Sequence, residues 1–400
     1  MGLRRNRDFV LYQAGQFLST AGSSLSSVAY PLLVLALTHS PAKAGLVSFA
    51  RLLPAPCFGL FAGVVADRLD RQRVMLAADA CRALTMAALA ILVTQGAPYW
   101  PIVLIAFLEG TGDIFFSASS TGAIRSVVPA DQLPNAIAVQ QGRAAVATLV
   151  GPPAGGALFS ISRALPFVGD AVSYACSFLA ILAMRTRFQQ PRERLPLRIR
   201  AELAEGFRFL WRQPFLRTTA IYYAVGNATI PAVLFIVVVV ARGQGLSGGS
   251  IGLLLALFSA GILIGSACSA SVRRRLSVRA VVLVEAYTGL LMAAYLVEPS
   301  VYVLLAAALP QAIVLPITDS YVVAHRIVAT PDRLLGRVEA VRITIARTAA
   351  PLGPLAAGVL LSATTGRTTV AVFTALTAGL AVYATLARPL RHPPPLEAVA

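Results

Sequence analysis

Charged residues are scarce in this chain of 400 residues. Asp, Glu, Lys and Arg together make up 13% of it, whereas soluble domains carry roughly 25%. Hydrophobic residues make up 57%, and the mean hydropathy is +0.74. This composition excludes an ordinary soluble domain and indicates an integral membrane protein. The net charge of +17 does not indicate nucleic-acid binding, because the basic residues stand in short breaks between apolar runs.

The sequence also lacks the signatures of metal, disulfide and nucleotide chemistry. Its four cysteines form no C-x-x-C pair and are interpreted as small buried hydrophobic residues, because all of them stand inside apolar runs. The three histidines have no metal-binding spacing, and no P-loop or nucleophile–base pair stands out. We therefore expect no cofactor, no metal and no enzyme activity.

Twelve apolar runs are long enough to cross a bilayer as helices, since a core of about 30 Å needs roughly 20 helical residues. The first six lie near 14–37, 43–66, 74–95, 99–124, 134–160 and 164–184. The second six lie near 216–240, 248–270, 280–297, 300–322, 337–362 and 368–387. The predicted fold class is all-α integral membrane, with 12 transmembrane helices in two six-helix bundles. The predicted domains are an N-terminal bundle at 1–188, a cytoplasmic linker at 189–215, a C-terminal bundle at 216–390 and a cytoplasmic tail at 391–400.

Basic residues are divided unevenly between the two sides of the membrane. With the N-terminus inside, the outer segments hold only Lys43, Arg163, Arg242 and Arg367. The positive-inside rule therefore places both termini in the cytoplasm of a multi-pass protein of the inner or plasma membrane. In the linker, residues 197–211 can form an amphipathic helix, with Phe207, Leu210 and Trp211 facing lipid.

The two halves repeat each other after a shift of 202 residues. The stretch GPPAGGALFS at 151–160 falls on GPLAAGVLLS at 353–362. Gly63, Arg71 and Arg73 fall on Gly265, Arg273 and Arg275. Two such halves predict pseudo-two-fold symmetry about an axis along the membrane normal, with a binding site near mid-bilayer between them. This organisation favours a rocking transporter over a one-bundle receptor.

A charged stretch between the second and third runs, GVVADRLDRQR, resembles the signature of the major facilitator superfamily, roughly G-x-x-x-D-R-x-G-R-R. The matching residues are Gly63, Asp67, Arg68, Arg71 and Arg73; Asp70 and Gln72 depart from the pattern. The D-R-x-D-R form, the linker EGFRFLWRQPFLR and the stretch GDAVSYACSF are similar to the subgroup of macrolide-efflux and enterobactin-type exporters. The resemblance covers essentially the whole chain and implies alternating access.

The same resemblance implies that this loop gates the inner side of the transporter. Independently, Asp67 at the inner end of the second helix can face the partly positive N-terminus of the eleventh helix. Gly63 is expected to let the second and eleventh helices approach closely. The alternative is that these charges only set the topology, although an acid such as Asp67 adds nothing to a positive-inside signal.

A second motif, GPPAGG in the fifth run, resembles the antiporter signature G-P-x-x-G-G of exporters. Its residues are Gly151, Pro152, Gly155 and Gly156. Proline removes a backbone donor and can kink the helix, and the glycines form a flat packing face. A kinked and closely packed helix can seal one side of the cavity, and ordinary close packing is the alternative.

Charges inside the membrane are costly and are functional candidates by default. Glu109 and Asp113 stand four residues apart on one helix face, and with Arg143 they form the predicted proton-coupling cluster; a static ion pair is the alternative. Arg51 needs an acidic partner, and Arg347 can meet an anionic substrate or a carboxylate. Asp79 and Arg82 are interpreted as a local ion pair supporting the charged loop. Structural roles are expected for Asp170, Glu285 and Asp319.

Hydroxyl and amide groups on the first and seventh runs are expected to line the cavity, with Tyr30, Tyr223 and Asn227 as candidates. The favoured function is secondary active, proton-coupled export of small amphipathic drug-like molecules or secondary metabolites. Expected partners are the substrate, protons and lipids, with a monomer as the working unit. The alternatives are a dedicated siderophore or lysolipid transporter, and a transport-inactive receptor or scaffold.

Overall fold

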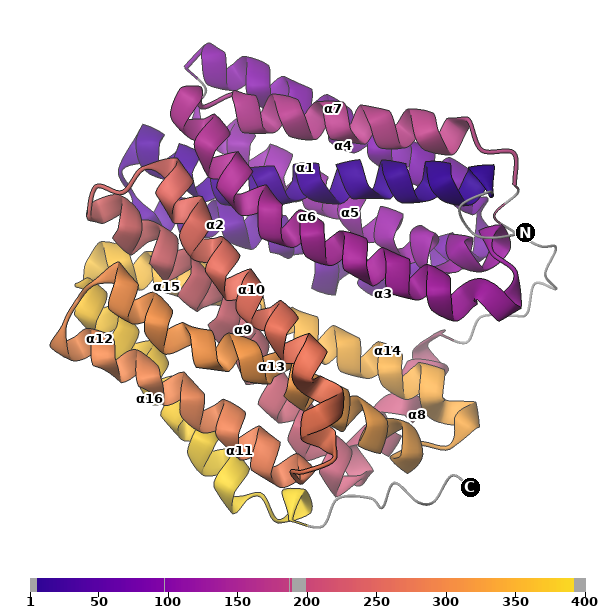
Figure 1. Ribbon diagram of the computed structural model, residues 1–400, viewed down its shortest axis with the longest axis vertical. Coiled ribbons are helices and arrows are strands. Elements are labelled where there is room, and N and C mark those ends of the chain that lie inside the picture. The colour runs from indigo at the N-terminus through magenta and orange to yellow at the C-terminus, as the bar shows by residue number, and fades with distance from the viewer. Residues whose placement is uncertain (1–5, 97, 187, 189–198, 392–400) are drawn as a thin grey trace. The chain divides into compact units, whose positions relative to one another are not determined.

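The computed structural model describes residues 6–391 except 97, 187 and 189–198, and these residues form helices joined by short turns (Figure 1). Twelve helical segments are long and apolar enough to cross a membrane, judged by length and composition. The predicted all-helical class and the number of spans are confirmed. The start of the predicted linker, 189–198, and the predicted tail after Arg391 lie outside the described residues.

The chain divides into two compact units. The first comprises Met1–Leu195 and Ala241–Ala256, and the second comprises Pro196–Val240 and Leu257–Ala400. This division differs from the predicted bundles in two respects. The segment Ala241–Ala256, which joins the end of α9 to the start of α10, groups with the first unit, and the boundary after Leu195 falls inside the predicted linker. The predicted domain boundaries themselves stay predictions.

The helices of the first half follow the six predicted spans. They are α1 (Arg7–Thr38), α2 (Pro41–Leu52), α3 (Pro54–Arg68), α4 (Arg71–Thr94), α5 (Tyr99–Val127), α6 (Leu133–Ile161) and α7 (Leu165–Leu182). Proline, or a capping side chain, explains several of the starts. Ser40 accepts a hydrogen bond from the backbone N–H of Lys43 and is followed by Pro41 at the first helical position.

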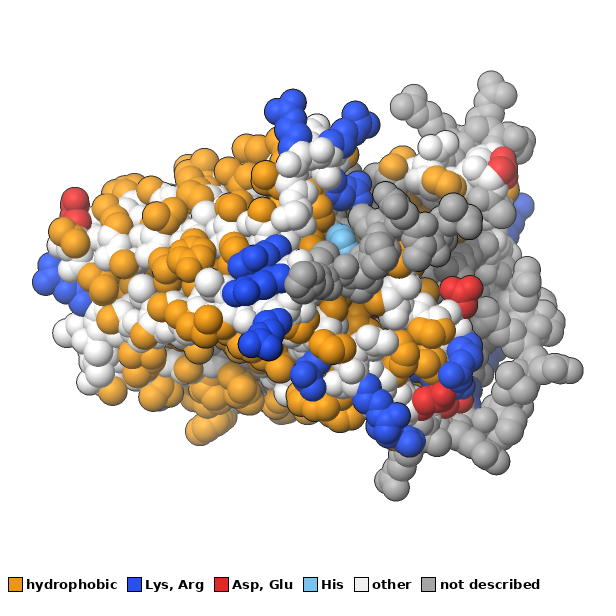
Figure 2. Space-filling model, turned by 90° about the horizontal axis from the view of Figure 1, so that it is seen from below, with side chains coloured by type: hydrophobic (Ala, Val, Ile, Leu, Met, Phe, Trp, Pro, Cys, Tyr) orange, Lys and Arg blue, Asp and Glu red, His pale blue; other side chains and the backbone are white. Residues whose placement is uncertain are grey.

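The second half begins with the linker helix α8 (Ile199–Arg212) and continues through six further spans. Its helices are α9 (Pro214–Gly243), α10 (Gly248–Arg273), α11 (Val278–Thr288), α12 (Ala294–Val297), α13 (Val301–Ala329), α14 (Asp332–Ala349), α15 (Leu352–Ala363) and α16 (Gly366–Leu386). Hydrophobic side chains cover much of the face in Figure 2, as expected of a surface that meets lipid tails.

Three spans are interrupted near their middle. Pro54 ends the α-helical ladder between α2 and α3, and Pro351 does the same between α14 and α15, because proline has no N–H to donate. The ninth span narrows into a 3₁₀ segment, Gly289–Ala293, between α11 and α12. The sequence analysis did not predict these breaks, because it identified spans by the length and apolarity of a run, and neither property changes where a helix is interrupted.

The linker helix α8 packs against α14 within the second unit. Glu205 forms ion pairs with Arg337 and, at 3.2 Å, with Arg333. Phe207 and Trp211 are exposed and stack with ring centroids 5.4 Å apart, which agrees with the predicted lipid-facing side. The prediction is wrong for Leu210, which is 1% exposed and belongs to the core of this unit. The side of α8 that carries Leu210 therefore packs against other helices of this unit and does not face lipid.

Glycines allow helices of each half to touch along their backbones. A Cβ built on Gly151 of α6 would overlap the Cβ of Ser24 on α1, and one built on Gly353 of α15 would overlap the carbonyl oxygen of Ala228 on α9. Gly151 and Gly353 are repeat counterparts. The same close approach therefore recurs in both units, between α6 and α1 and between α15 and α9.

This packing predicts opposite outcomes for two alanine substitutions on the same helix. Gly151→Ala should lower the midpoint of thermal unfolding by roughly 3–10 °C, because an added methyl in a full contact costs about 1–3 kcal/mol. Gly142→Ala is the matched control, because a Cβ there meets no atom within 4 Å, and alanine is the better helix former. The measurement is thermal unfolding of both purified variants. Equal midpoints would contradict the packing of α6 on α1.

Candidate functional site

The candidate site of the first unit is a group of buried charges at the end of α2 and near the middle of α4 and α5. Arg82 on α4 and Glu109 on α5 are 2% and 1% exposed. Burial of this kind requires close partners, because an isolated charge in an apolar interior is very costly. Gly110 and Gly112 lie between Glu109 and Asp113 and leave the space that the arginines occupy. A Cβ on Gly112 would lie 2.6 Å from Cγ of Arg82, and one on Gly110 would overlap the carbonyl oxygen of Arg51.

Arg82 is the centre of this group. Its Nη2 atom lies 2.7 Å from the Tyr174 hydroxyl, 3.1 Å from Oγ of Ser23, 3.3 Å from Oδ1 of Asp113 and 3.4 Å from Oε1 of Glu109. The guanidinium also lies over the Tyr174 ring, 3.9 Å from its centroid. Four oxygens compete for the two hydrogens on Nη2. The arginine can therefore exchange partners without leaving its position.

Arg51 supplies the second positive charge. Its Nε donates to Oε2 of Glu109 at 2.7 Å, and Tyr174 donates to the other carboxylate oxygen at 3.0 Å. Both oxygens of Glu109 are thus occupied, which matches the strong, charge-assisted pairing that buried ions need. The expectation that Arg51 pairs with one of the two central acids agrees with this geometry.

Two further acids are fully buried beside this group but less well paired. Asp79 has the Ser177 hydroxyl as its hydrogen-bonding neighbour, and Nη1 of Arg82 lies 3.9 Å away. Asp170 on α7 accepts from Ser173 on Oδ1 at 3.3 Å and has the Ser26 hydroxyl as a second hydrogen-bonding neighbour. Both residues have 0% exposure. They are the least compensated carboxylates of the site.

The site holds more acids than bases. It contains two arginines and four carboxyl groups: Arg51, Arg82, Asp79, Glu109, Asp113 and Asp170. If every group were ionised, the site would carry two uncompensated negative charges in a low-dielectric interior. Two protons would make it neutral. Asp113 is the group with access to the surroundings of its unit, since its side chain is 54% exposed.

The sequence prediction grouped the two acids with Arg143, whereas the structure groups them with Arg82 and Arg51. Arg143 forms no described ion pair with Glu109 or Asp113, and its Nε and Nη1 atoms have no hydrogen-bond partner among the described residues. Arg82 takes that place. Counting from the true start of α4 at Arg71, Arg82 is at mid-helix, whereas a start at 74 placed it too near the inner face. The pattern EGTGD at residues 109–113 was a second signal that the sequence offered for this site, because its two glycines leave space beside the two acids.

The charged loop between α3 and α4 is held by contacts within the first unit. Asp70 caps α4 by accepting from the N–H groups of Gln72 and Arg73 at 2.9 and 3.3 Å. Arg71 donates to Asp67 at 3.2 Å and to the carbonyl of Ala66 at 3.0 Å. Asp70, which departs from the signature, therefore has a capping role of its own. The side chain of Asp67 is 66% exposed.

The other predicted residues are placed as follows. Within its unit, Gly63 has no atom within 4 Å of an added Cβ, whereas Gly155 faces the Leu25 backbone and Gly156 the Gly248 backbone. Tyr30 is 1% exposed and stacks edge-on with Phe167, so it is a core residue of its unit. Arg347 is exposed at the end of α14.

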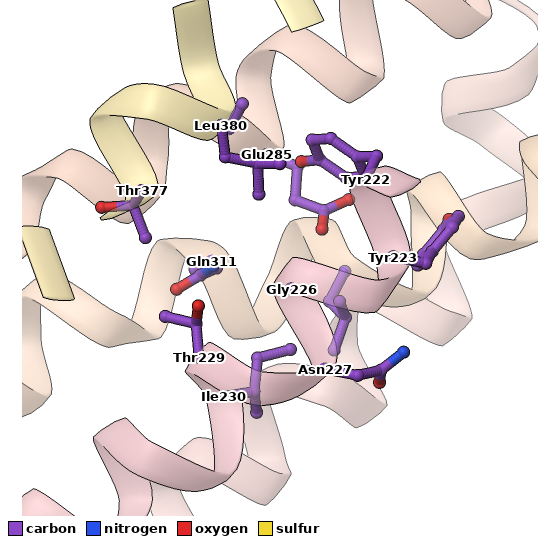
Figure 3. A pocket seen from close by; sticks show the side chains of 12 residues that line it. Tyr222, Tyr223, Gly226, Asn227, Thr229, Ile230, Glu285, Gln311, Thr377 and Leu380 are labelled. Carbon is purple, nitrogen blue, oxygen red and sulfur yellow. The ribbon is translucent and has the colours of Figure 1, made fainter. Parts of the chain in front are cut away.

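A pocket in the second unit includes two of the predicted cavity residues, Tyr223 and Asn227. It lies between α9, α11, α13 and α16 (Figure 3) and has a volume of about 20 Å³, room for about one water molecule. Glu285, for which a structural role was expected near a helix end, lines it from α11 and is 4% exposed. No sequence motif marks this glutamate.

Several known proteins resemble this chain, over most of its length or over part of it. The family described as transmembrane secretion effector matches residues 3–398. The multidrug efflux pump Tap of Mycolicibacterium fortuitum is 30% identical over 359 residues, 86% of each chain. Macrolide efflux protein A of Streptococcus pyogenes is 27% identical over 157 residues, 38% of each chain.

Solved structures agree on the fold. A bacterial homologue of the iron transporter ferroportin superposes with a TM-score of 0.75 at 16% identity, covering 96% of this chain and 99% of that one. A bacterial homologue of the human lysosomal transporter Spinster gives 0.73 at 15% identity, covering 97% and 98%. The family match extends over nearly the whole sequence. The chain therefore belongs to the transmembrane secretion effector family of the major facilitator superfamily, as a multi-pass membrane transporter related to efflux pumps and not an enzyme.

Proposed function

We propose that this protein is a proton-coupled exporter of small amphipathic molecules, such as drugs or secondary metabolites, that works by alternating access with both termini in the cytoplasm. The observation that carries the proposal is the buried site in which Arg82 is shared by Glu109 and the half-exposed Asp113. Similarity to the multidrug pump Tap supports the substrate class and the direction. Transport driven by an ion gradient needs a group that loads and releases that ion.

Asp113 is the proposed entry point for the proton. When it is ionised, it holds one of the four positions around Nη2 of Arg82. Protonation removes its charge, so the guanidinium then depends on Glu109 and Tyr174 for its partners. This change of partners by Arg82, together with the loss of the Asp113 charge, alters the net charge of the site near the middle of the helices. It is the local event that a rocking motion of the two halves can follow.

An anionic substrate, such as a siderophore or a phosphate headgroup, is less well supported. That alternative depended on Arg51, Arg143 and Arg347. The charge of Arg51 is already compensated, because it donates to Glu109 at 2.7 Å. Since the acids of the first unit outnumber its buried arginines, the site there attracts cations more than anions.

Replacing the proposed proton acceptor should uncouple transport from the proton gradient. Asp113→Asn should abolish the acceleration of ethidium uptake into inverted vesicles by an acidic lumen, while downhill exchange continues. Asp131→Asn is the matched control, since Asp131 is exposed on the turn before α6 and should leave coupling unchanged. Uptake with and without nigericin measures the effect. An uptake by Asp113→Asn that still responds fully to the gradient would refute Asp113 as the coupling group.

The charged loop gives a second test of alternating access. Asp67→Asn should slow transport at least tenfold if this carboxylate helps to close the inner side, since an amide cannot replace its charge. Asp70→Asn in the same loop should transport at near the wild-type rate, because asparagine caps a helix about as well as aspartate. Initial export rates of the two variants at matched expression decide the question. Equal rates would leave the loop with a topogenic role only.

A further inference from the structure

The small pocket of the second unit is lined by oxygen-bearing side chains from four different helices. They are Thr229 on α9, Glu285 on α11, Gln311 on α13 and Thr377 on α16. Figure 3 shows Gln311 and Thr229 around the same space as the Glu285 carboxylate. With a volume of about 20 Å³, the pocket has room for about one water molecule or one small ion. An occupant of that size can contact all four helices at once.

The one acid of this pocket has no basic partner. Glu285 is 4% exposed, and among the described residues no Lys, Arg or His side chain forms an ion pair with it or lines the pocket. The hydroxyls of Tyr222 and Thr318 are its hydrogen-bonding neighbours. Hydroxyls satisfy part of the hydrogen-bonding capacity of a carboxylate but do not cancel its charge, which is costly in an apolar interior. The pocket therefore attracts a cation.

The two threonines present oxygen lone pairs, and not hydrogens, to the pocket. Thr229 donates its hydroxyl hydrogen to the carbonyl of Val225 at 3.0 Å. Thr377 likewise donates to the carbonyl of Thr374 at 2.8 Å. A hydroxyl whose hydrogen is engaged within its own helix can only accept on its free side. With the carboxylate and the amide oxygen of Gln311, these hydroxyls form a set of oxygen ligands, which hard cations prefer.

The end of an α-helix adjoins the same pocket. The α-helical ladder of α11 ends at Thr288, where the 3₁₀ segment Gly289–Ala293 begins. A Cβ built on Gly289 would lie 3.4 Å from Nε2 of Gln311 and 3.5 Å from Cγ2 of Thr377, so this point of the chain touches the pocket wall. Carbonyl groups at the carboxyl end of a helix carry partial negative charge. That charge also favours a cation here.

We propose that this pocket binds one Na⁺ ion, with Glu285 as its counter-ion and the threonine and glutamine oxygens as further ligands. A monovalent ion balances one carboxylate, whereas a divalent ion would leave a net positive charge in the apolar interior. Na⁺ is close to a water molecule in size, and K⁺ is larger. The lack of His and Cys patterns in the sequence does not oppose such a site, because Na⁺ binds oxygen atoms. The inference does not depend on the proposed substrate or on the direction of transport.

The first test is equilibrium binding of radioactive Na⁺ to the full-length protein in nanodiscs of zwitterionic lipid. The wild type should bind about one ion per chain, and Glu285→Gln should raise the Kd at least tenfold because it removes the negative charge. Glu298→Gln, at the exposed end of the same span, is the matched control and should bind as the wild type does. No saturable binding by the wild type, or an unchanged Kd for Glu285→Gln, would overturn the site. Equal competition by K⁺ would overturn the choice of Na⁺.

A pair of threonine variants on α16 tests the neutral ligands. Thr377→Val removes a pocket hydroxyl and should raise the Kd for Na⁺ by about threefold to tenfold, the scale of one neutral interaction. Thr374→Val removes a hydroxyl that donates to the Val370 carbonyl and is not among the residues that line the pocket, so its Kd should match the wild type. The same Kd for both variants would contradict Thr377 as a ligand.

A third measurement uses the wild-type chain, so that it does not depend on folding of a variant. Dicyclohexylcarbodiimide labels buried carboxyl groups, and peptide mass spectrometry can quantify its adduct on Glu285. Na⁺ at about ten times its Kd should slow this labelling about tenfold, because only the ion-free carboxyl group reacts, and choline at equal ionic strength should not. Labelling that ignores Na⁺ would overturn the site, and a proton with one water molecule would then be its occupant. Gradient-driven transport by the wild type would still stand in that case.

Discussion

The sharing of one buried guanidinium among several oxygens is the constraint on which the first half of this transporter depends. Arg82 draws α1, α4, α5 and α7 together, because Ser23, Tyr174 and two acids all reach the same nitrogen. Removing one partner of a buried ion pair typically costs about 3–5 kcal/mol. The packing of these helices therefore depends on the position of the Arg82 charge, and the position of that charge depends on the packing. A change in protonation at this point is a change in helix contacts.

The two halves share backbone geometry but not charge. Gly151 and Gly353 are repeat counterparts, and each allows its helix to approach another helix closely, α1 in the first half and α9 in the second. The first half surrounds its central glutamate with arginines, while Glu285 of the second half is left with hydroxyl neighbours. The glycines that close helix packing requires are present in both halves. The buried charges of the two halves diverged.

The sequence predicted the twelve spans closely, because a bilayer makes length and apolarity the dominant signals. It also predicted that Glu109 and Asp113 would be central, since acids are rare in membrane interiors. It did not predict Arg82 as their partner. The partner depends on which faces of α4 and α5 meet, and a sequence gives no direct measure of helix rotation. The assignment of Leu210 to lipid failed for a related reason, since α14 covers a side that the pattern of α8 presents as free.

The attachment of α8 has a mechanical consequence. Glu205 and Arg337 fasten this helix to α14, so it is a rigid part of the second unit and not a slack tether between two halves. Phe207 and Trp211 then ride on that unit as an aromatic anchor suited to the membrane interface. If this pair lies at the interface, a motion of the second bundle would move it along the lipid headgroups, and the composition of that leaflet would then affect the work of the transport cycle.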